Sequence, residues 1–333
     1  MSKLRAATRS CPFNPRTLRA VLVAVAFPVL AVALIAGVSS ISPTAVAGVL
    51  VSGRWEWLLV AGLAYALANM VSALVWREGL SAAGLASLPL GQVVRAHWLC
   101  RGASEFLPAQ LGEAARLAAL KDRPETKKRM WRVVGSIGAF KIVDGGLSLI
   151  VAITIVAFLG APLLPGASTF ALVGLVAAAA VITVALVWRF RCTVVPKRLR
   201  PALNELSLGV GLLRGNHPVA PALALQSVAT ALRILSIAAL MPAYGAPVAA
   251  APMIFALLVL TGLLPISPGG AGVREAAVVP VLIVSYGIGL ETALAVSFAT
   301  QAVGLVTSLL GAGIALAAGS RVEVAPAPVP QPA

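Results

Sequence analysis

Long apolar runs alternate with short basic stretches along most of the chain. Six clear runs cover about 20–38, 57–76, 133–159, 170–187, 219–241 and 292–318. Two shorter runs, 252–264 and 276–288, precede the last of them. Because a membrane-spanning helix takes about 20 apolar residues, the pattern predicts an all-α, polytopic integral membrane bundle of about seven or eight spans.

Composition supports this fold class and excludes others. Hydrophobic residues make up 59% of the 333 positions and charged residues only 11%, whereas charged residues make up about a quarter of a soluble domain. A disordered chain would need low hydrophobicity. The expected organisation is a cytoplasmic basic N-terminus at 1–19, a transmembrane bundle at 20–318 and a disordered Pro/Ala tail at 319–333. An alternative for the first run is a signal peptide cleaved near 45–47.

The basic residues predict an orientation. Five Lys or Arg lie in 1–19, six in 121–132 and six in 189–214, while the loops 160–167 and 242–251 carry none. The positive-inside rule places the three basic stretches in the cytoplasm and the chain in the cytoplasmic membrane. Their spacing between apolar runs is unlike a nucleic-acid-binding surface, so no nucleic-acid partner is expected. The basic stretches set orientation, or they also attract anionic lipid head groups.

The residues that usually carry metal or covalent chemistry are scarce. The chain has three cysteines and two histidines, and none has metal-ligand spacing. No phosphate-binding loop and no dinucleotide-binding glycine motif occurs, and no nucleophile triad is visible. We therefore expect no catalytic residue, metal or cofactor, and we expect that the protein is not an enzyme.

One motif occurs twice. FLPAQLGEAAR covers 106–116, and LPISPGGAGVRE covers 264–275. Each joins Leu-Pro to glycine and a Glu/Arg pair, and its proline and glycine break a helix. The motif residues that we expect to bind substrate are Pro108, Gly112, Glu113, Arg116, Pro268, Gly269, Gly270, Gly272, Arg274 and Glu275.

The two motifs are candidate anion sites. Pro108 and Pro268 can each begin a helix, and a helix N-terminus inside a membrane attracts anions. Broken helices at corresponding places in two halves are typical of a transporter binding site. The alternative is a pair of cytoplasmic turns with Arg116 and Arg274 snorkelling at the interface. By the count of basic residues, the two halves that carry these motifs begin on the same side of the membrane, which indicates a parallel repeat.

Several charged residues interrupt the apolar runs. The segment 85–107 is too polar to face lipid, so we expect a re-entrant or cavity-facing helix there. Lys141 and Asp144 share one helix face at i and i+3 and should be paired and face inward. They lock helices together, or they handle substrate or protons. Arg233 is a similar single charge that could contact a phosphate or Glu113.

These motifs resemble those of a known family. LPAQLGEAAR, FKIVD and LLPISPGGAGVREAA are similar to the lysylphosphatidylglycerol synthase transmembrane family, also called flippase-like, over about 22–318. The resemblance implies a bundle with two re-entrant elements. In relatives that carry a soluble aminoacyl-transferase domain, the bundle moves the aminoacylated lipid to the outer leaflet. This chain departs from the family pattern at Lys141, where Arg is usual, and at Glu105, near where Asn is common.

Three functions follow as hypotheses. The first is a translocase for a phospholipid or lipid-linked intermediate, with an anionic or polyprenyl-linked head group bound between the broken helices. The second is a membrane-embedded transferase or its accessory subunit, in which Glu105 or Asp144 would act as a general base and the basic loops would dock a synthase. The third is a structural membrane protein without a substrate, in which the motif residues tolerate substitution.

Overall fold

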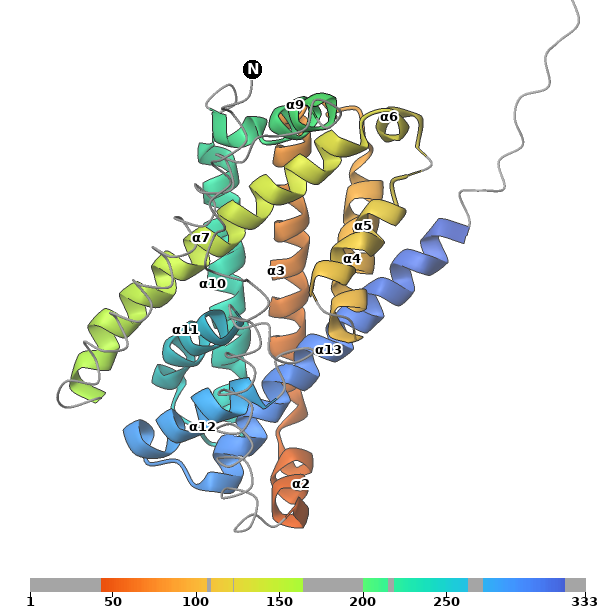
Figure 1. The fold of residues 1–333 in the computed structure, drawn as a ribbon. Helices are drawn as coiled ribbons and strands as arrows, with labels where there is room; N and C mark the ends of the chain where they lie inside the picture. The colour runs from red at the N-terminus through yellow and green to blue at the C-terminus, as the bar shows by residue number, and fades with distance from the viewer. Residues whose placement is uncertain are drawn as a thin grey trace, which may run out of the picture.

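The computed structural model describes residues 43–106, 109–121, 123–163, 200–214, 219–262 and 272–320, and these form helices joined by short turns (Figure 1). The elements are α2 (Pro43–Ser52), α3 (Trp55–Ala82), α4 (Leu90–Phe106), α5 (Ala109–Ala118), α6 (Pro124–Lys127), α7 (Met130–Leu163), α9 (Arg200–Gly209), η2 (Gly211–Arg214), α10 (Ala220–Ala243), η3 (Val248–Ala250), α11 (Ala251–Gly262), α12 (Val273–Tyr286) and α13 (Leu290–Ser320). The expected fold class, a helical membrane bundle, is confirmed.

Four of the described helices are long and apolar enough to cross a membrane. They are Trp55–Ala82, Met130–Leu159, Ala220–Ala243 and Leu290–Ala318. The expected spans 20–38 and 170–187 lie outside the described residues, as do the N-terminal segment 1–19 and positions 321–333 of the expected tail. The span count expected from the sequence therefore stays a prediction.

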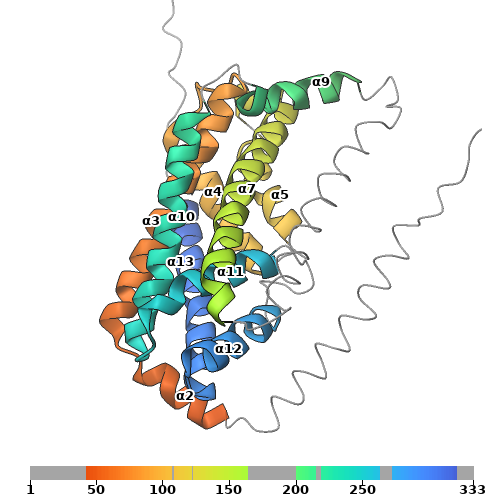
Figure 2. The same ribbon diagram turned by 90° about the vertical axis from the view of Figure 1, so that its left-hand side faces the viewer.

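Helices α3 and α10 form the antiparallel centre of the bundle (Figures 1 and 2). The backbone N–H of Arg54, before α3, donates to the carbonyl of Ala243 at the end of α10 over 3.2 Å. About a quarter of the way along α3, the Ser236 hydroxyl of α10 donates to the Ala61 carbonyl over 2.8 Å. These contacts hold the two helices side by side. Helix α2 lies at one end of the molecule, and α6 and α9 lie at the other (Figure 1).

Helices α4 and α5 form a hairpin that opens toward the α6 and α9 end. The limbs pack so tightly that a Cβ on Gly112 would lie 1.9 Å from the Ser104 hydroxyl. The turn before α4 lies beside the segment after α6, where Arg129 donates to the Gly84 carbonyl over 3.4 Å. The polar segment at 85–107 thus enters from one end of the molecule and α5 returns the chain to that end, as expected for a re-entrant element.

Helices α11 and α12 form a second hairpin, and it opens toward the α2 end (Figure 1). The Tyr286 hydroxyl at the end of α12 donates to the Ala249 carbonyl just before α11 over 3.4 Å. The two helices have 12 and 14 residues, or about 18 and 21 Å at 1.5 Å per residue. A bilayer core is about 30 Å thick. The runs 252–264 and 276–288, expected as spans, are therefore limbs of a hairpin.

The two hairpins enter from opposite ends, so the described halves form an inverted arrangement. Helix α3, a hairpin and α7 make up the first half, and α10, a hairpin and α13 the second. The parallel repeat inferred from the charge count is wrong. That count treated 252–264 as a full crossing, and removing one crossing reverses the side from which the second motif enters.

Each hairpin packs on its own apolar core. One cluster holds Val75, Val93 and Val143 around the first hairpin. The other holds Ile237, Ile254 and Val278 around the second. Along α3 and α10 the two clusters are separated by the polar side chains of Ser72, Gln226 and Arg233, which lie near the middle of these helices. The bundle therefore has a polar layer between two apolar cores.

Helix α9 packs closely on the first turns of α7. A Cβ on Gly135 would lie 2.3 Å from the Leu206 carbonyl oxygen and 2.7 Å from the Gly209 Cα. Beside this contact, Arg132 binds both oxygens of Glu205 over 2.5 and 3.2 Å. These hydrogen bonds hold the pKa of the Glu205 carboxyl below its usual value. Glycine at both positions lets the two backbones approach this closely.

Candidate functional site

Arg116 from the first motif is enclosed by protein. Its side chain is 1% exposed, and the guanidinium lies 4.5 Å from the Trp76 ring centroid and 5.2 Å from that of Phe140. Arg116 donates to His97 Nδ1 over 3.3 Å. These contacts join α5 to α3, α4 and α7. In this arrangement Arg116 holds the hairpin in place, and the direct head-group contact expected of it stays a prediction.

Glu113 links Arg116 to Lys141. Glu113 lies one turn before Arg116 on α5. Its Oε2 lies 3.3 Å from Arg116 Nε, and its Oε1 lies 2.8 Å from Lys141 Nζ on α7. The Glu113 side chain is 18% exposed, whereas that of Lys141 is 50% exposed. A single carboxylate thus serves one buried and one accessible cation. Three residues expected at the site, Glu113, Arg116 and Lys141, do come together. Lys141 was expected to face inward, and this is wrong, because its side chain is half exposed.

Asp144 lies one turn after Lys141 and belongs to the polar layer. Its Oδ1 accepts from Arg233 Nη1 over 2.8 Å and from Gln226 Nε2 over 2.6 Å. Arg233 Nη2 also donates to the Ser72 hydroxyl over 2.9 Å. These contacts join α3, α7 and α10 near mid-bundle. The expected pairing of Asp144 is thus present, and Arg233 contacts Asp144, not Glu113.

Both motifs are only partly within the described residues, since Pro108 of the first and Pro268, Gly269 and Gly270 of the second lie outside them. Gly272 precedes α12 with φ +83°, a conformation that favours glycine. Its N–H donates to Glu275 Oε2 over 2.6 Å, and Gln301 of α13 donates to the other oxygen. The buried Nε of Arg274 has no hydrogen-bond partner among the described residues.

The two halves repeat one polar contact. Glu113 of the second limb of the first hairpin pairs with Lys141 of α7, and Glu275 of the second limb of the second hairpin bonds to Gln301 of α13. Lys141 and Gln301 each lie eleven residues after the first residue of their helix. In the first half the carboxylate pairs with a cation, Lys141, and in the second it accepts from a neutral amide, Gln301. The inverted halves are therefore alike in geometry and unlike in charge.

The charged residues around α7 leave one positive charge uncompensated. We call this set the charged cluster. It consists of Glu113, Arg116, Lys141, Asp144 and Arg233. Three cations face two carboxylates, and the accessible cation is Lys141. A low-dielectric surrounding strengthens the attraction between this excess positive charge and an anion, so the cluster suits an anionic ligand.

Sequence reasoning missed several polar residues of this region. Ser72 and Gln226 hydrogen-bond within the polar layer, and His97 and Trp76 enclose Arg116. A signal existed for Gln226, since it lies seven residues before Arg233 and therefore on the same face of α10. No local pattern pointed to Ser72, because polar contacts across helices depend on packing.

Under the alternative transferase hypothesis, Glu105 or Asp144 would act as the general base. Glu105 Oε1 accepts a hydrogen bond from Ser308 over 3.0 Å, and Asp144 is held by a guanidinium and an amide. Across the described part of the chain, no group of three or more His, Cys, Asp or Glu is placed to hold a metal ion.

A protein-family model matches most of the chain. The model described as "Lysylphosphatidylglycerol synthase TM region" matches residues 19–311. It includes both hairpins and the charged cluster. No curated protein matches the sequence.

Proposed function

The chain belongs to the lysylphosphatidylglycerol synthase transmembrane-region family, and from this premise we propose that it moves a lipid with an anionic head group across the membrane. The family match and the apolar helices make it a multi-pass protein associated with membrane lipids. The proposed step is exchange between leaflets without a covalent intermediate. The membrane is the cytoplasmic membrane, and the basic end with α6 faces the cytoplasm.

The proposal rests on one observation, which is that Lys141 is half exposed and has a single carboxylate partner. Its ammonium group has one carboxylate partner, Glu113, which also serves Arg116. Half of the Lys141 side chain is exposed, and an ammonium group has three donors. A phosphate oxygen of a lipid can therefore bind Lys141 without displacing Arg116.

The arrangement of the halves supports movement of the bound lipid. Inverted halves with hairpins that enter from opposite ends are typical of transporters with a midplane site. Here the polar layer with Asp144 and Arg233 lies near the middle of α3 and α10. A head group at Lys141 is one helical turn from this layer. The polar layer would spare the head group full contact with hydrocarbon during crossing.

Translocation in vesicles tests the proposal. Purified protein is reconstituted, and loss of fluorescence of NBD-phosphatidylglycerol after dithionite addition reports its exposure in the outer leaflet. We expect Lys141→Gln to slow translocation at least about tenfold, since a hydrogen bond to a charged group contributes about 1.5–3 kcal/mol. Lys141→Arg should retain most of the rate.

Matched controls separate the site from general charge effects. Lys128→Gln removes an exposed basic residue next to α6 and should leave the rate unchanged. NBD-phosphatidylcholine, which has no net charge, should move more slowly than the anionic lipid in the wild type. Equal rates for wild type and Lys141→Gln would overturn the assignment of Lys141, and no protein-dependent movement would overturn the translocase proposal.

A further inference from the structure

Helix α3 presents a polar face to the interior of the bundle. The face consists of Tyr65, Asn69, Ser72 and Trp76. Their spacings of four, three and four residues place them on one side of the helix. Trp76 is the nearest of them to the end that carries α6 and α9, and Tyr65 is the farthest from it. The eleven residues from Tyr65 to Trp76 span about 16 Å at 1.5 Å per residue. The face therefore passes through the polar layer, to which Ser72 belongs.

An arginine from another helix contacts this face at three of its residues. We call this set the arginine row, and it consists of Arg116 at Trp76, Arg233 at Ser72 and Arg101 at Tyr65. Arg101 of α4 donates to the Tyr65 hydroxyl, and its guanidinium carbon lies 5.9 Å from the Tyr65 ring centroid. Tyr65 is seven residues from Ser72, or about 10 Å along α3. Arg101 therefore contacts α3 beyond the polar layer, on the side away from the basic end.

Arg101 differs from the rest of the arginine row because no carboxylate pairs with it. The other two arginines form ion pairs, whereas Arg101 forms none with any residue that the structure describes. Glu105, one turn later on α4, accepts from the Ser308 hydroxyl of α13 over 3.0 Å instead. Arg101 Nε is also buried without a hydrogen-bond partner in the described part of the chain. A charge at membrane depth is costly unless it is paired, so Arg101 is suited to hold an anion.

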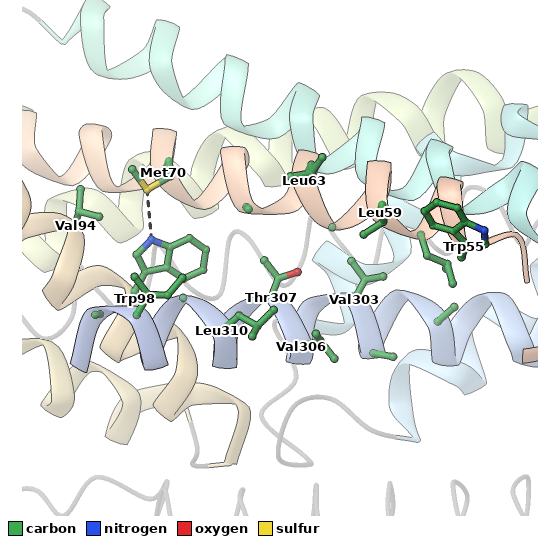
Figure 3. A pocket seen from close by; sticks show the side chains of 18 of the residues that line it. Trp55, Leu59, Leu63, Met70, Val94, Trp98, Val303, Val306, Thr307 and Leu310 are labelled. Carbon is green, nitrogen blue, oxygen red and sulfur yellow. Dashed lines mark hydrogen bonds between the residues drawn. The ribbon is translucent and has the colours of Figure 1, made fainter. Parts of the chain in front are cut away.

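Another face of α3 is apolar and lines a groove with α13 (Figure 3). The groove has a volume of about 1010 Å³. Leu63 and Met70 of α3 and Leu310 of α13 point into it. An ordinary acyl chain can fill such a groove, so its lining does not select among lipid tails. Any selection of the lipid therefore depends on the charged groups that meet the head group.

We propose that Arg101 is a second phosphate-binding residue for the transported lipid, which the head group reaches after Lys141 and the polar layer. This inference rests on the proposed function and adds a later position to the same crossing. A guanidinium has five N–H donors, of which the Tyr65 hydroxyl accepts from one. The others can bind two phosphate oxygens at once. Lys141 and Arg101 thus provide a cation on each side of the polar layer, whose own charges are paired.

Native mass spectrometry of the purified protein tests this with two probes that have the same tails. Dioleoyl phosphatidylglycerol is anionic and dioleoyl phosphatidylcholine has no net charge, so the ratio of their affinities reports recognition of the head group. Lys141→Gln should still prefer phosphatidylglycerol, because Arg101 remains. Adding Arg101→Gln should lower the phosphatidylglycerol affinity at least about tenfold further and remove the preference. Arg77→Gln, which removes an exposed cation outside the polar face of α3, is the matched control and should leave the preference unchanged.

Two neighbouring variants separate phosphate binding from a role in holding α4 on α3. If Arg101 only ties the helices together through Tyr65, Tyr65→Phe should lower the phosphatidylglycerol affinity as much as Arg101→Gln does. If Arg101 binds phosphate, Tyr65→Phe frees a donor and should retain the affinity. Glu105→Gln removes a nearby negative charge that repels phosphate, so it should raise the affinity. Should Arg101→Gln not fold, Glu105→Gln decides, and an unchanged affinity there would overturn the assignment.

The outcomes separate this inference from the proposed function. If Lys141→Gln binds the two lipids equally, the second anion site does not exist, and translocation that depends on Lys141 is unaffected. An undiminished phosphatidylglycerol affinity in a folded Lys141→Gln/Arg101→Gln variant would also overturn the inference. Equal losses in Tyr65→Phe and Arg101→Gln would assign Arg101 to the attachment of α4. A preference that depends on Arg101, without any translocation by the wild type, would refute only the translocase proposal.

Discussion

Lys141 Nζ lies 2.8 Å from Glu113 Oε1, while the other oxygen of the same carboxylate lies 3.3 Å from Arg116 Nε. The two cations differ in environment, because Arg116 is 1% exposed and Lys141 is 50% exposed. The buried cation joins the first hairpin to its neighbours. The exposed one leaves donors available to a ligand. A single carboxylate therefore connects the stability of the hairpin with the proposed binding of lipid.

Glu113→Gln should destabilise the protein, because the amide leaves the buried Arg116 charge uncompensated. Breaking a buried ion pair from one side costs about 3–5 kcal/mol. Thermal unfolding in detergent should show a clear drop in Tm. Glu56→Gln, at an exposed position in the first turn of α3, should leave Tm almost unchanged.

The double variant Glu113→Gln/Arg116→Met shows whether the uncompensated charge is the cause. Removing both partners takes the unpaired cation out of the interior, so the double variant should be more stable than Glu113→Gln alone. Contacts of the kind seen here are expected to couple by about 0.5–3 kcal/mol in such a cycle. Strictly additive losses would show that the Glu113–Arg116 contact is not what stabilises the hairpin.

Gly135→Ala should weaken the packing of α9 on α7. The new methyl group would meet backbone atoms of Leu206 and Gly209 at 2.3 and 2.7 Å, and backbone yields less easily than a side chain. Overpacking of this kind costs about 1–3 kcal/mol, measurable as a lower Tm. Gly138→Ala, three residues later on the exposed side, should raise stability by up to about 1 kcal/mol through helix propensity. A neutral Gly135→Ala would show that α9 is not fixed in this position.

The orientation of the bundle can be tested with single cysteines. In a background with Cys11, Cys100 and Cys192 replaced by Ser, Lys128→Cys places a thiol directly after α6, at one end of the molecule. Val248→Cys places one shortly after α10, at the opposite end, which carries α2. The charge count puts the Lys128 end in the cytoplasm. A membrane-impermeant maleimide should therefore label Val248→Cys in intact cells and Lys128→Cys only after permeabilisation. The reverse pattern would invert the proposed orientation.

Local sequence patterns predicted much of the fold. The runs of apolar residues predicted the four long helices, and Pro and Gly predicted the breaks at both motifs. The repeated motif predicted that Glu113 and Glu275 belong to a substrate-binding site, and that role stays a prediction. In the structure the two carboxylates make corresponding contacts, to Lys141 and Gln301. Gln301 carried no signal, because one amide in an apolar helix has no partner that the sequence reveals.

By itself, the sequence determined the fold class, the four described long helices and the family, because hydrophobicity, helix breakers and motif residues are local properties of the chain. Only the tertiary structure decided that the second hairpin enters from the other end, that Arg233 pairs with Asp144 and that Arg116 is enclosed while Lys141 is accessible. These features depend on which side chains meet across helices far apart in sequence. Charge and spacing along one helix set which face a residue occupies, but packing against other helices sets its partner and its exposure.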